Sequence, residues 1–266
     1  MVVVYFISVA LLLANSFWRV NSLTGGVIRE WSLHNYDTVF TWNVRTAFLH
    51  ETYFTMAWRT VSMAALVTLA DIAFGFMIAY YAARIASPRA RSAVMIAAVI
   101  PLWANYLIRV FAWRSIVEGH GPADALLRLA GIHTSLYATS FAMWLTFCYL
   151  WLPYAILPIY AALERVPASY LEASGDLGAH AGMTFRQIVL PLAVPGIVAG
   201  SIFTFSLTLG DYIVAPLIGK GLFLGNGIAQ LNINNRPLAA TLAVVAMTIV
   251  FIYLALAKRT GAFEAL

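Results

Sequence analysis

Long apolar stretches alternate with short polar ones along the chain, and this alternation is its dominant pattern. The apolar runs occupy residues 2–17, 60–83, 92–112, 138–162, 192–209 and 239–257. A helix needs about 20 mostly apolar residues to cross the hydrocarbon core of a bilayer, and these runs approach or exceed that length. Strands of a transmembrane barrel would be shorter and would alternate in polarity. The pattern predicts an all-α, polytopic protein with six transmembrane helices in a single domain over residues 1–266.

The first apolar run, residues 2–17, also has the length of the apolar part of a signal peptide. Signal peptides begin with basic residues and end at a cleavage site of small residues. Neither feature is present in convincing form around this run. We therefore expect the run to be retained as the first span.

The overall composition agrees with a membrane protein. Hydrophobic residues make up 62% of the chain and charged residues only 10%, and the mean hydropathy is +0.83. This leaves too little polar surface to solvate a globular protein, so membrane lipid is a predicted partner. The net charge of +5 is scattered over loops and span ends, which argues against nucleic-acid binding. The single cysteine, Cys148, allows neither an internal disulfide nor a thiolate metal cluster.

The basic residues indicate how the spans are oriented. Those after the second and fourth spans and in the C-terminal tail lie in short stretches, whereas a similar number on the opposite side is spread over longer loops. Positive charges hold a segment in the cytoplasm mainly when they lie in short loops close to a span. The polar segment at residues 163–190, between the fourth and fifth apolar runs, is therefore predicted to be cytoplasmic.

This segment, called the loop segment below, has a helical pattern of its own. Proline is favoured in the first turn of a helix, so Pro167 is expected to begin a helix that ends near Leu177. Residues at three- and four-residue spacings share one face of that helix. They are Tyr170, Leu171, Ser174 and Leu177.

A glycine separates this helix from a second one. Gly178 is expected to take the left-handed conformation that ends a helix and turns the chain. Thr184 is expected to cap a short helix over residues 185–190, and Pro191 to start the fifth span. Taken by itself, such a segment could be an amphipathic loop that lies in the lipid interface.

The loop segment resembles the EAA loop of the membrane subunits of bacterial ATP-binding-cassette (ABC) importers. The residues that carry the resemblance are Glu172, Ala173, Ser174, Gly178, Ile188, Leu190 and Pro191. Serine at position 174 departs from the alanine of the family pattern. The resemblance implies that the loop docks onto an ABC ATPase subunit. Glu172 would then meet a cation of the ATPase, the face around Leu171 and Leu177 would fill its groove, and Gly178 would set the bend.

A second resemblance lies in the third span. Residues 100–113, with the sequence IPLWANYLIRVFAW, are similar to the third-span signature of the first permease subunit of spermidine/putrescine importers. Residues 75–81, 209–212 and 224–226 are similar to the same group, although importers of other solutes share these shorter motifs. The fold that the resemblance implies is the type I (MetI-like) importer permease, with five core helices and a peripheral first helix.

The resemblance also implies partners and a location. Two ABC ATPase subunits, a second homologous permease and a periplasmic substrate-binding protein would assemble with this chain in the bacterial inner membrane. The implied function is to form half of a translocation pathway for polyamines such as spermidine and putrescine, driven by ATP hydrolysis in the partner subunit. Thiosulfate, ferric iron, phosphonates and opine-like compounds are the alternative solutes.

Polar residues in or near the spans are the candidates for a substrate pathway, because charged groups there are rare and usually functional. The candidates are Asp71, Asn105, Tyr106, Asp211 and Tyr212. The two carboxylates would suit a polyamine cation. A structural role is an alternative for each, such as a buried pair of Asp71 with Arg109. Arg109 itself is expected to snorkel or to pair.

Other functions lack the residues that they need. ATP hydrolysis requires a Gly-x-x-x-x-Gly-Lys-Ser/Thr phosphate loop, which this sequence does not contain, so the chain is predicted not to be an enzyme. The five histidines have no metal-binding spacing, and no catalytic set, metal or cofactor is predicted. A secondary transporter or channel, the rival hypothesis, would need coupling ionisable groups or a selectivity filter within the bundle.

Overall fold

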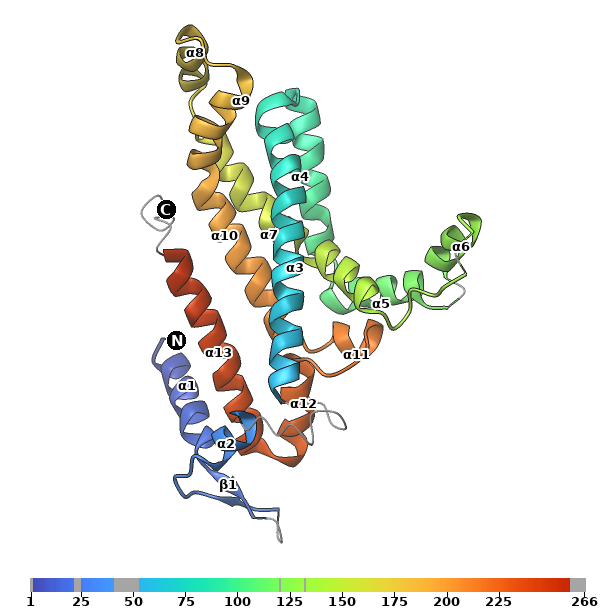
Figure 1. Cartoon of the computed structure of the whole chain (residues 1–266), viewed down its shortest axis with the longest axis vertical. Helices are drawn as coiled ribbons and strands as arrows, with labels where there is room; N and C mark the ends of the chain where they lie inside the picture. The colour runs from blue at the N-terminus through green and yellow to red at the C-terminus, as the bar shows by residue number, and fades with distance from the viewer. Residues whose placement is uncertain (1, 22–24, 41–52, 120, 132, 259–266) are drawn as a thin grey trace.

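The chain folds into an elongated bundle of helices (Figure 1). The structure, a computed structural model, describes residues 2–21, 25–40, 53–119, 121–131 and 133–258. Its helices are α1 Val2–Ser16, α2 His34–Phe40, α3 Tyr53–Tyr80, α4 Pro88–Trp103, α5 Tyr106–Val117, α6 Pro122–Leu129, α7 Ser140–Glu164, α8 Ala168–Asp176, α9 Ala181–Thr184, α10 Leu190–Gly210, α11 Val214–Ile218, α12 Leu224–Asn234 and α13 Arg236–Lys258. Two π-helical turns, η1 Tyr81–Ile85 and η2 Phe185–Val189, extend α3 and precede α10. The predicted all-α fold is confirmed.

The described strands are limited to one small hairpin. Strands β1 Arg19–Val20 and β2 Val27–Ile28 pair antiparallel, with Arg19 opposite Ile28. The hairpin lies between α1 and α2 and is far from the helices that form the core (Figure 1).

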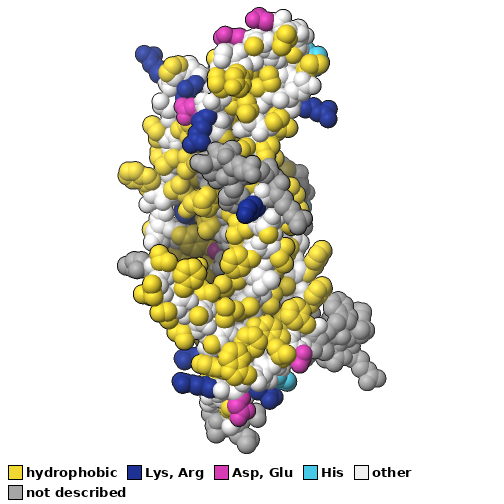
Figure 2. Space-filling model, turned by 90° about the vertical axis from the view of Figure 1, so that its left-hand side faces the viewer, with side chains coloured by type: hydrophobic (Ala, Val, Ile, Leu, Met, Phe, Trp, Pro, Cys, Tyr) yellow, Lys and Arg dark blue, Asp and Glu magenta, His cyan; other side chains and the backbone are white. Residues whose placement is uncertain are grey.

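Within the part of the chain that the structure describes, four helical segments are long and apolar enough to cross a membrane. They are Tyr53–Ile85, Ser140–Glu164, Ala181–Gly210 and Arg236–Lys258. These segments contain the predicted second, fifth and sixth spans, and all but the first two residues of the predicted fourth span. On the face shown in Figure 2, apolar side chains form a broad belt, and most acidic and basic side chains gather at the two ends of the molecule. This distribution fits a bilayer around the middle of the bundle.

The other two predicted spans differ from the observed helices. Helix α1 has 15 residues, which at about 1.5 Å per residue falls short of a hydrocarbon core about 30 Å thick. The predicted third span is broken between α4 and α5, and the segments Pro88–Trp103 and Tyr106–Leu129 are bent by 99° relative to one another. The break has a local cause. Ala104 has an extended backbone, and the side chain of Asn105 caps α5 by accepting a hydrogen bond of 2.9 Å from the amide of Leu107.

The core is built on α3, α7 and α10, which pack against one another along most of their lengths, while α13 lies against α10 and α12 and α1 lies against α13. A close helix contact fixes the α7–α10 pair. A side chain at Gly196 of α10 would overlap the carbonyl oxygen of Pro158, and one at Gly200 would crowd Ala155. Small residues four apart let two helices approach closely. Inside a membrane this close packing drives helix association, because apolar side chains pack equally well against lipid.

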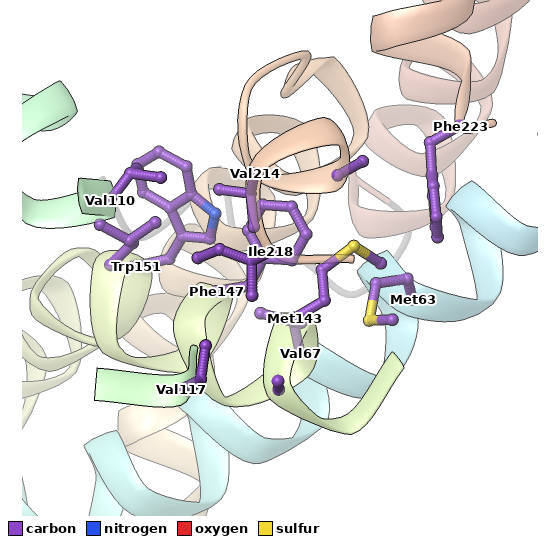
Figure 3. Close-up of a cluster of buried hydrophobic side chains, with 13 residues drawn as sticks. Met63, Val67, Val110, Val117, Met143, Phe147, Trp151, Val214, Ile218 and Phe223 are labelled. Carbon is purple, nitrogen blue, oxygen red and sulfur yellow. The ribbon is translucent and has the colours of Figure 1, made fainter. Parts of the chain in front are cut away.

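Figure 3 shows a cluster of buried apolar side chains that pack between the helices. It joins α3, α5, α7 and α11 through Met63, Val67, Val110, Val117, Met143, Phe147, Trp151, Val214 and Ile218. We call the end that carries α8 and α9 the loop end, and the end that carries α5, α11 and α12 the groove end. Both ends contain residues that the sequence singled out.

Candidate functional site

At the loop end, α8 projects beyond the other helices (Figure 1). It begins one residue later than predicted, because Pro167 is its N-cap and has an extended backbone. Gly178 has a φ of +78°, so the predicted left-handed conformation is present. A side chain at this φ is strained, whereas glycine adopts it freely. The chain therefore turns at Gly178, between α8 and α9.

Of the four side chains predicted to share one face of α8, two pack against the rest of the protein and two are exposed. Ser174 is buried and its hydroxyl lies 2.8 Å from that of Thr184, while Leu171 is half-buried in a cluster with Phe185 and Val189. Tyr170 is instead exposed, and Leu177 is 88% exposed. The predicted face is therefore not buried as a unit, because spacing alone does not specify how far a short helix is rotated against its neighbours.

The other residues of the family motif divide in the same way. Glu172 and Ala173 are exposed on α8. Ile188 and Leu190 are half-buried where η2 joins α10, and Pro191 is exposed in the first turn of α10. The outward part of the loop segment thus carries acidic and apolar groups together.

The start of the second helix of the loop segment differs from the prediction. The cap of α9 is His180, whose Nδ1 accepts a hydrogen bond of 3.0 Å from the amide of Met183. Thr184, the predicted cap, lies inside the helix and faces Ser174. Helical structure then continues through η2 into α10, so the span reaches back to Ala181 rather than starting at Pro191.

At the groove end, the bend between α4 and α5 brings two predicted residues together. The hydroxyl of Tyr106, the first residue of α5, donates a hydrogen bond to Oδ2 of Asp211. Oδ1 of Asp211 accepts from the amides of Ile213 and Val214 at 3.0 and 2.8 Å. Asp211 therefore joins the end of α10 to the starts of α5 and α11. A carboxylate can accept about four hydrogen bonds, so one acceptor position remains.

These residues line a groove of about 280 Å³, which we call the Asp211 groove. Its lining is Tyr106, Trp151, Ser206, Leu207, Gly210, Asp211, Tyr212 and Ile213. The Trp151 ring of α7 stacks on Tyr106 with a centroid distance of 5.8 Å and an interplanar angle of 8°. Tyr212 is exposed and lies at the rim. One carboxylate thus lies among aromatic rings, and the lining contains no lysine or arginine.

A close backbone contact holds the groove in place. A Cβ atom at Gly225, in the first turn of α12, would overlap the carbonyl oxygen of Asp211. The amide of the preceding Leu224 donates a hydrogen bond of 2.9 Å to Thr60 of α3. Two short motifs that lie apart in the sequence, at residues 209–212 and 224–226, therefore meet in space.

The remaining candidates lie outside the groove lining. Asn105 is exposed and its side chain caps α5. Asp71 of α3 is 0% exposed and lies beside the thiol of Cys148, and neither of its oxygens receives a hydrogen bond of good geometry. Arg109 does not snorkel, because its side chain is buried and donates a bond of 3.4 Å to the carbonyl of Leu150. The alternative pair of Asp71 with Arg109 is not formed.

Trp151 and His180 are two of the site residues that sequence reasoning did not identify. Trp151 lies in the middle of an apolar run, where a tryptophan resembles any packing or anchoring aromatic residue. His180 caps a helix, although histidine is not among the preferred capping residues. Only the neighbours of these side chains reveal their roles.

The sequence of residues 52–259 matches the family of binding-protein-dependent transport system inner membrane components. The chain belongs to this permease family. Membership confirms the resemblance to importer permeases. It also makes the chain a non-enzymatic, multi-pass component of the bacterial inner membrane.

Curated relatives in the permease family match most of the chain. The inner membrane ABC transporter permease protein YdcU of Escherichia coli is 40% identical over 281 aligned residues, which cover 99% of this chain and 87% of YdcU. The spermidine/putrescine permease protein PotB of E. coli is 31% identical, and the aligned region covers 80% of this chain and 79% of PotB. PotC of the same system is 34% identical over 93 residues, which cover 35% of the chain and 34% of PotC.

Solved structures of ABC importers share the fold. A bacterial transporter for the acidic polysaccharide alginate matches with a TM-score of 0.65 at 17% identity, over 85% of this chain and 87% of that one. The MetNI methionine transporter in an inward-facing conformation matches with a TM-score of 0.62 at 18% identity, over 85% of this chain and 100% of the matched MetNI chain. The predicted MetI-like fold of the permease family is therefore confirmed.

Proposed function

We propose that this permease forms half of the translocation pathway of a polyamine importer and that the Asp211 groove receives an ammonium group of the solute. The single observation that carries the proposal is the carboxylate of Asp211 among the rings of Tyr106, Trp151 and Tyr212. Cations are attracted both to carboxylates and to the faces of aromatic rings. The spermidine/putrescine permease PotB, at 31% identity, supports the same solute class.

The charge of the groove favours a cation over the alternative solutes. Thiosulfate and phosphonates are anions, and the groove lining offers them a carboxylate and no basic side chain. A polyamine also has methylene groups between its ammonium ends, and these can lie on aromatic surface while the charges stay paired. At about 280 Å³ the groove has room for one end of such a molecule, so a second permease would enclose the rest.

The loop segment is the proposed docking surface for the ABC ATPase. Leu177 and Tyr170 are exposed at the tip of the bundle, next to the exposed acid Glu172. Exposed apolar side chains at a protein's tip are typical of an interface with a partner. In this role the ATPase would grip α8, and Gly178 would keep the angle between α8 and the span. A periplasmic binding protein would deliver the solute at the groove end.

The experiment is solute-stimulated ATP hydrolysis in a reconstituted complex. The permease is purified with its ATPase, its second permease and its binding protein, and is placed in nanodiscs. Spermidine or putrescine is expected to raise ATP hydrolysis, whereas thiosulfate and a phosphonate are expected to leave it at the basal rate. Stimulation by an anion instead would refute the polyamine assignment. Purification without any ATPase, together with solute flux in liposomes that lack ATP, would refute the importer function.

A further inference from the structure

The loop segment is held at its beginning by a helix from which it is distant in sequence. Arg84 lies in η1, at the loop end of α3. Its Nη2 atom donates hydrogen bonds to the carbonyl oxygens of Leu163 and Val166, at 2.5 and 2.8 Å. Both oxygens lie where α7 ends and the loop segment begins. The last carbonyls of a helix have no partner within it and carry partial negative charge, so a guanidinium binds them well.

The loop segment is held at its end by the same helix. The ring of Phe185, the first residue of η2, meets the rings of Phe76 and Tyr80 edge-on, with centroid distances of 5.8 Å to each. Phe76 and Tyr80 stack on one another one helical turn apart on α3. Edge-to-face aromatic contacts of this kind contribute about 0.5–1.5 kcal/mol beyond their buried area. Helix α3 therefore contacts both sides of a segment that is covalently continuous only with α7 and α10.

A second arginine extends this connection to α4. Arg91, in the first turns of α4, donates from Nε to the carbonyl of Ala82 at 3.0 Å and from Nη2 to that of Ala83 at 3.3 Å. Both carbonyls lie in η1. Helix α4 leads directly to the bend at Asn105 and so to Tyr106 in the Asp211 groove. The loop segment is thus linked through Arg84, η1 and Arg91 to the groove at the other end of the molecule.

We propose that Arg84 and Arg91 are positioning residues that make the loop segment, the end of α3 and α4 move as one body. A displacement of the loop segment is then carried along α4 to the bend, where it moves Tyr106 relative to Asp211. Without Arg84, only the ring contacts of Phe185 hold the loop segment to the end of α3, so α4 follows a displacement of the loop segment less closely. This inference rests on the proposed function, because it assumes that an ATPase moves the loop segment.

The first test measures coupling in the reconstituted importer. Arg84→Ala is expected to retain ATP hydrolysis while the solute transported per ATP falls about tenfold, which corresponds to about 1.4 kcal/mol. Arg84→Lys keeps one charged donor and is expected to restore part of the ratio. The matched control is Arg89→Ala, which removes the same charge from an exposed position on α4 and should leave the ratio within twofold of wild type.

The second test measures the movement directly. Spin labels are placed at Ala168 of α8 and Ser92 of α4, both exposed, in a Cys148→Ala background that retains transport. In the otherwise wild-type complex the distance between labels should be the same with and without bound ATP, because both helices belong to one body. In the Arg84→Ala complex the distance should differ between the two states.

Three results would overturn the proposal. The first is a normal transport ratio in Arg84→Ala, and the second is an equal loss of transport and ATP hydrolysis, which a purely structural role would produce. The third is a label distance that already changes with ATP in the wild-type background. Failure of the proposed function is visible earlier and separately, because the wild-type complex would then show no solute-stimulated ATP hydrolysis.

Discussion

The loop end and the groove end of the bundle differ in where their polar groups point. At the loop end, arginine side chains bind carbonyl oxygens between helices, and the apolar Leu177 is exposed on the outside. At the groove end, the polar groups of Tyr106 and Asp211 face one another inside, beside the buried Trp151. A region that binds a partner protein needs rigid packing inside and exposed apolar side chains outside. A region that binds a solute needs its polar and charged side chains to face the interior. Substitutions at the two ends should therefore have different effects on stability, solute affinity and coupling.

The largest effect is expected at the close backbone contact of the groove end. Gly225→Val would force α12 away from Asp211, because the new side chain overlaps that residue's carbonyl oxygen. Overpacking of this kind costs about 1–3 kcal/mol and sometimes more. We expect a lower thermal unfolding midpoint and less protein in the membrane. Gly210→Ala is the control, since a Cβ there meets nothing within 4 Å. Equal midpoints for the two variants would contradict the contact.

The next effect concerns the charge in the groove. Asp211→Asn keeps the shape of the side chain but removes its negative charge. A hydrogen bond to a charged group contributes about 1.5–3 kcal/mol, so we expect the concentration of polyamine at half-maximal uptake to rise about tenfold or more. Glu118→Gln removes a charge from an exposed residue after α5 and should change uptake little. Similar losses in both variants would point to the overall charge rather than to the groove.

A smaller effect is expected at the bend of the loop end. Gly178→Val places a β-branched residue at a φ of +78°, which costs about 1–2 kcal/mol or more. We expect a normal amount of protein in the membrane and a loss of transport of about tenfold. Gly175→Ala is the matched control, because Gly175 lies in α8 without a positive φ and with free space around it. Normal transport by Gly178→Val would show that the bend does not transmit movement.

The smallest effect is expected between the two ends, at Asp71. This carboxyl is fully buried beside the thiol of Cys148 and does not line the Asp211 groove. Asp71→Asn should keep polyamine uptake within about twofold, a change below about 0.5 kcal/mol. The unfolding midpoint should change little, because a carboxyl buried without a cation stays neutral and the substitution replaces it by a neutral amide of the same shape. A strong loss of uptake at an unchanged midpoint would instead place Asp71 in the pathway.

Much of the fold could be predicted from the sequence because the bilayer acts on each segment separately. The apolar runs that became α3, α7, α10 and α13 were recognisable one by one. The turn at Gly178 was also predictable, since glycine at the end of a helix has a local conformational reason. The bend between α4 and α5 was missed, because Ala104 and Asn105 interrupt the helix without interrupting the apolar pattern.

The candidate site was predictable only in part. The sequence suggested Tyr106 and Asp211 as separate candidates, but their hydrogen bond joins residues 105 positions apart. Nothing in the sequence distinguished Trp151 from other aromatic residues, or Arg84 from the basic residues that orient a membrane protein. The rotation of α8, which buries Ser174 and exposes Leu177, likewise depends on its contacts with η2 and α10.

The sequence alone determined that the chain is a helical membrane protein with a polar loop segment of the importer type. Hydrophobic length and local turn chemistry act over a few neighbouring residues, and both can be found along the chain. Only the tertiary structure decided that Asp211 meets Tyr106, that Asp71 does not pair with Arg109 and that Arg84 holds the end of α7. These outcomes depend on which distant segments pack together, and a hydrogen bond forms only where packing brings donor and acceptor within about 3 Å.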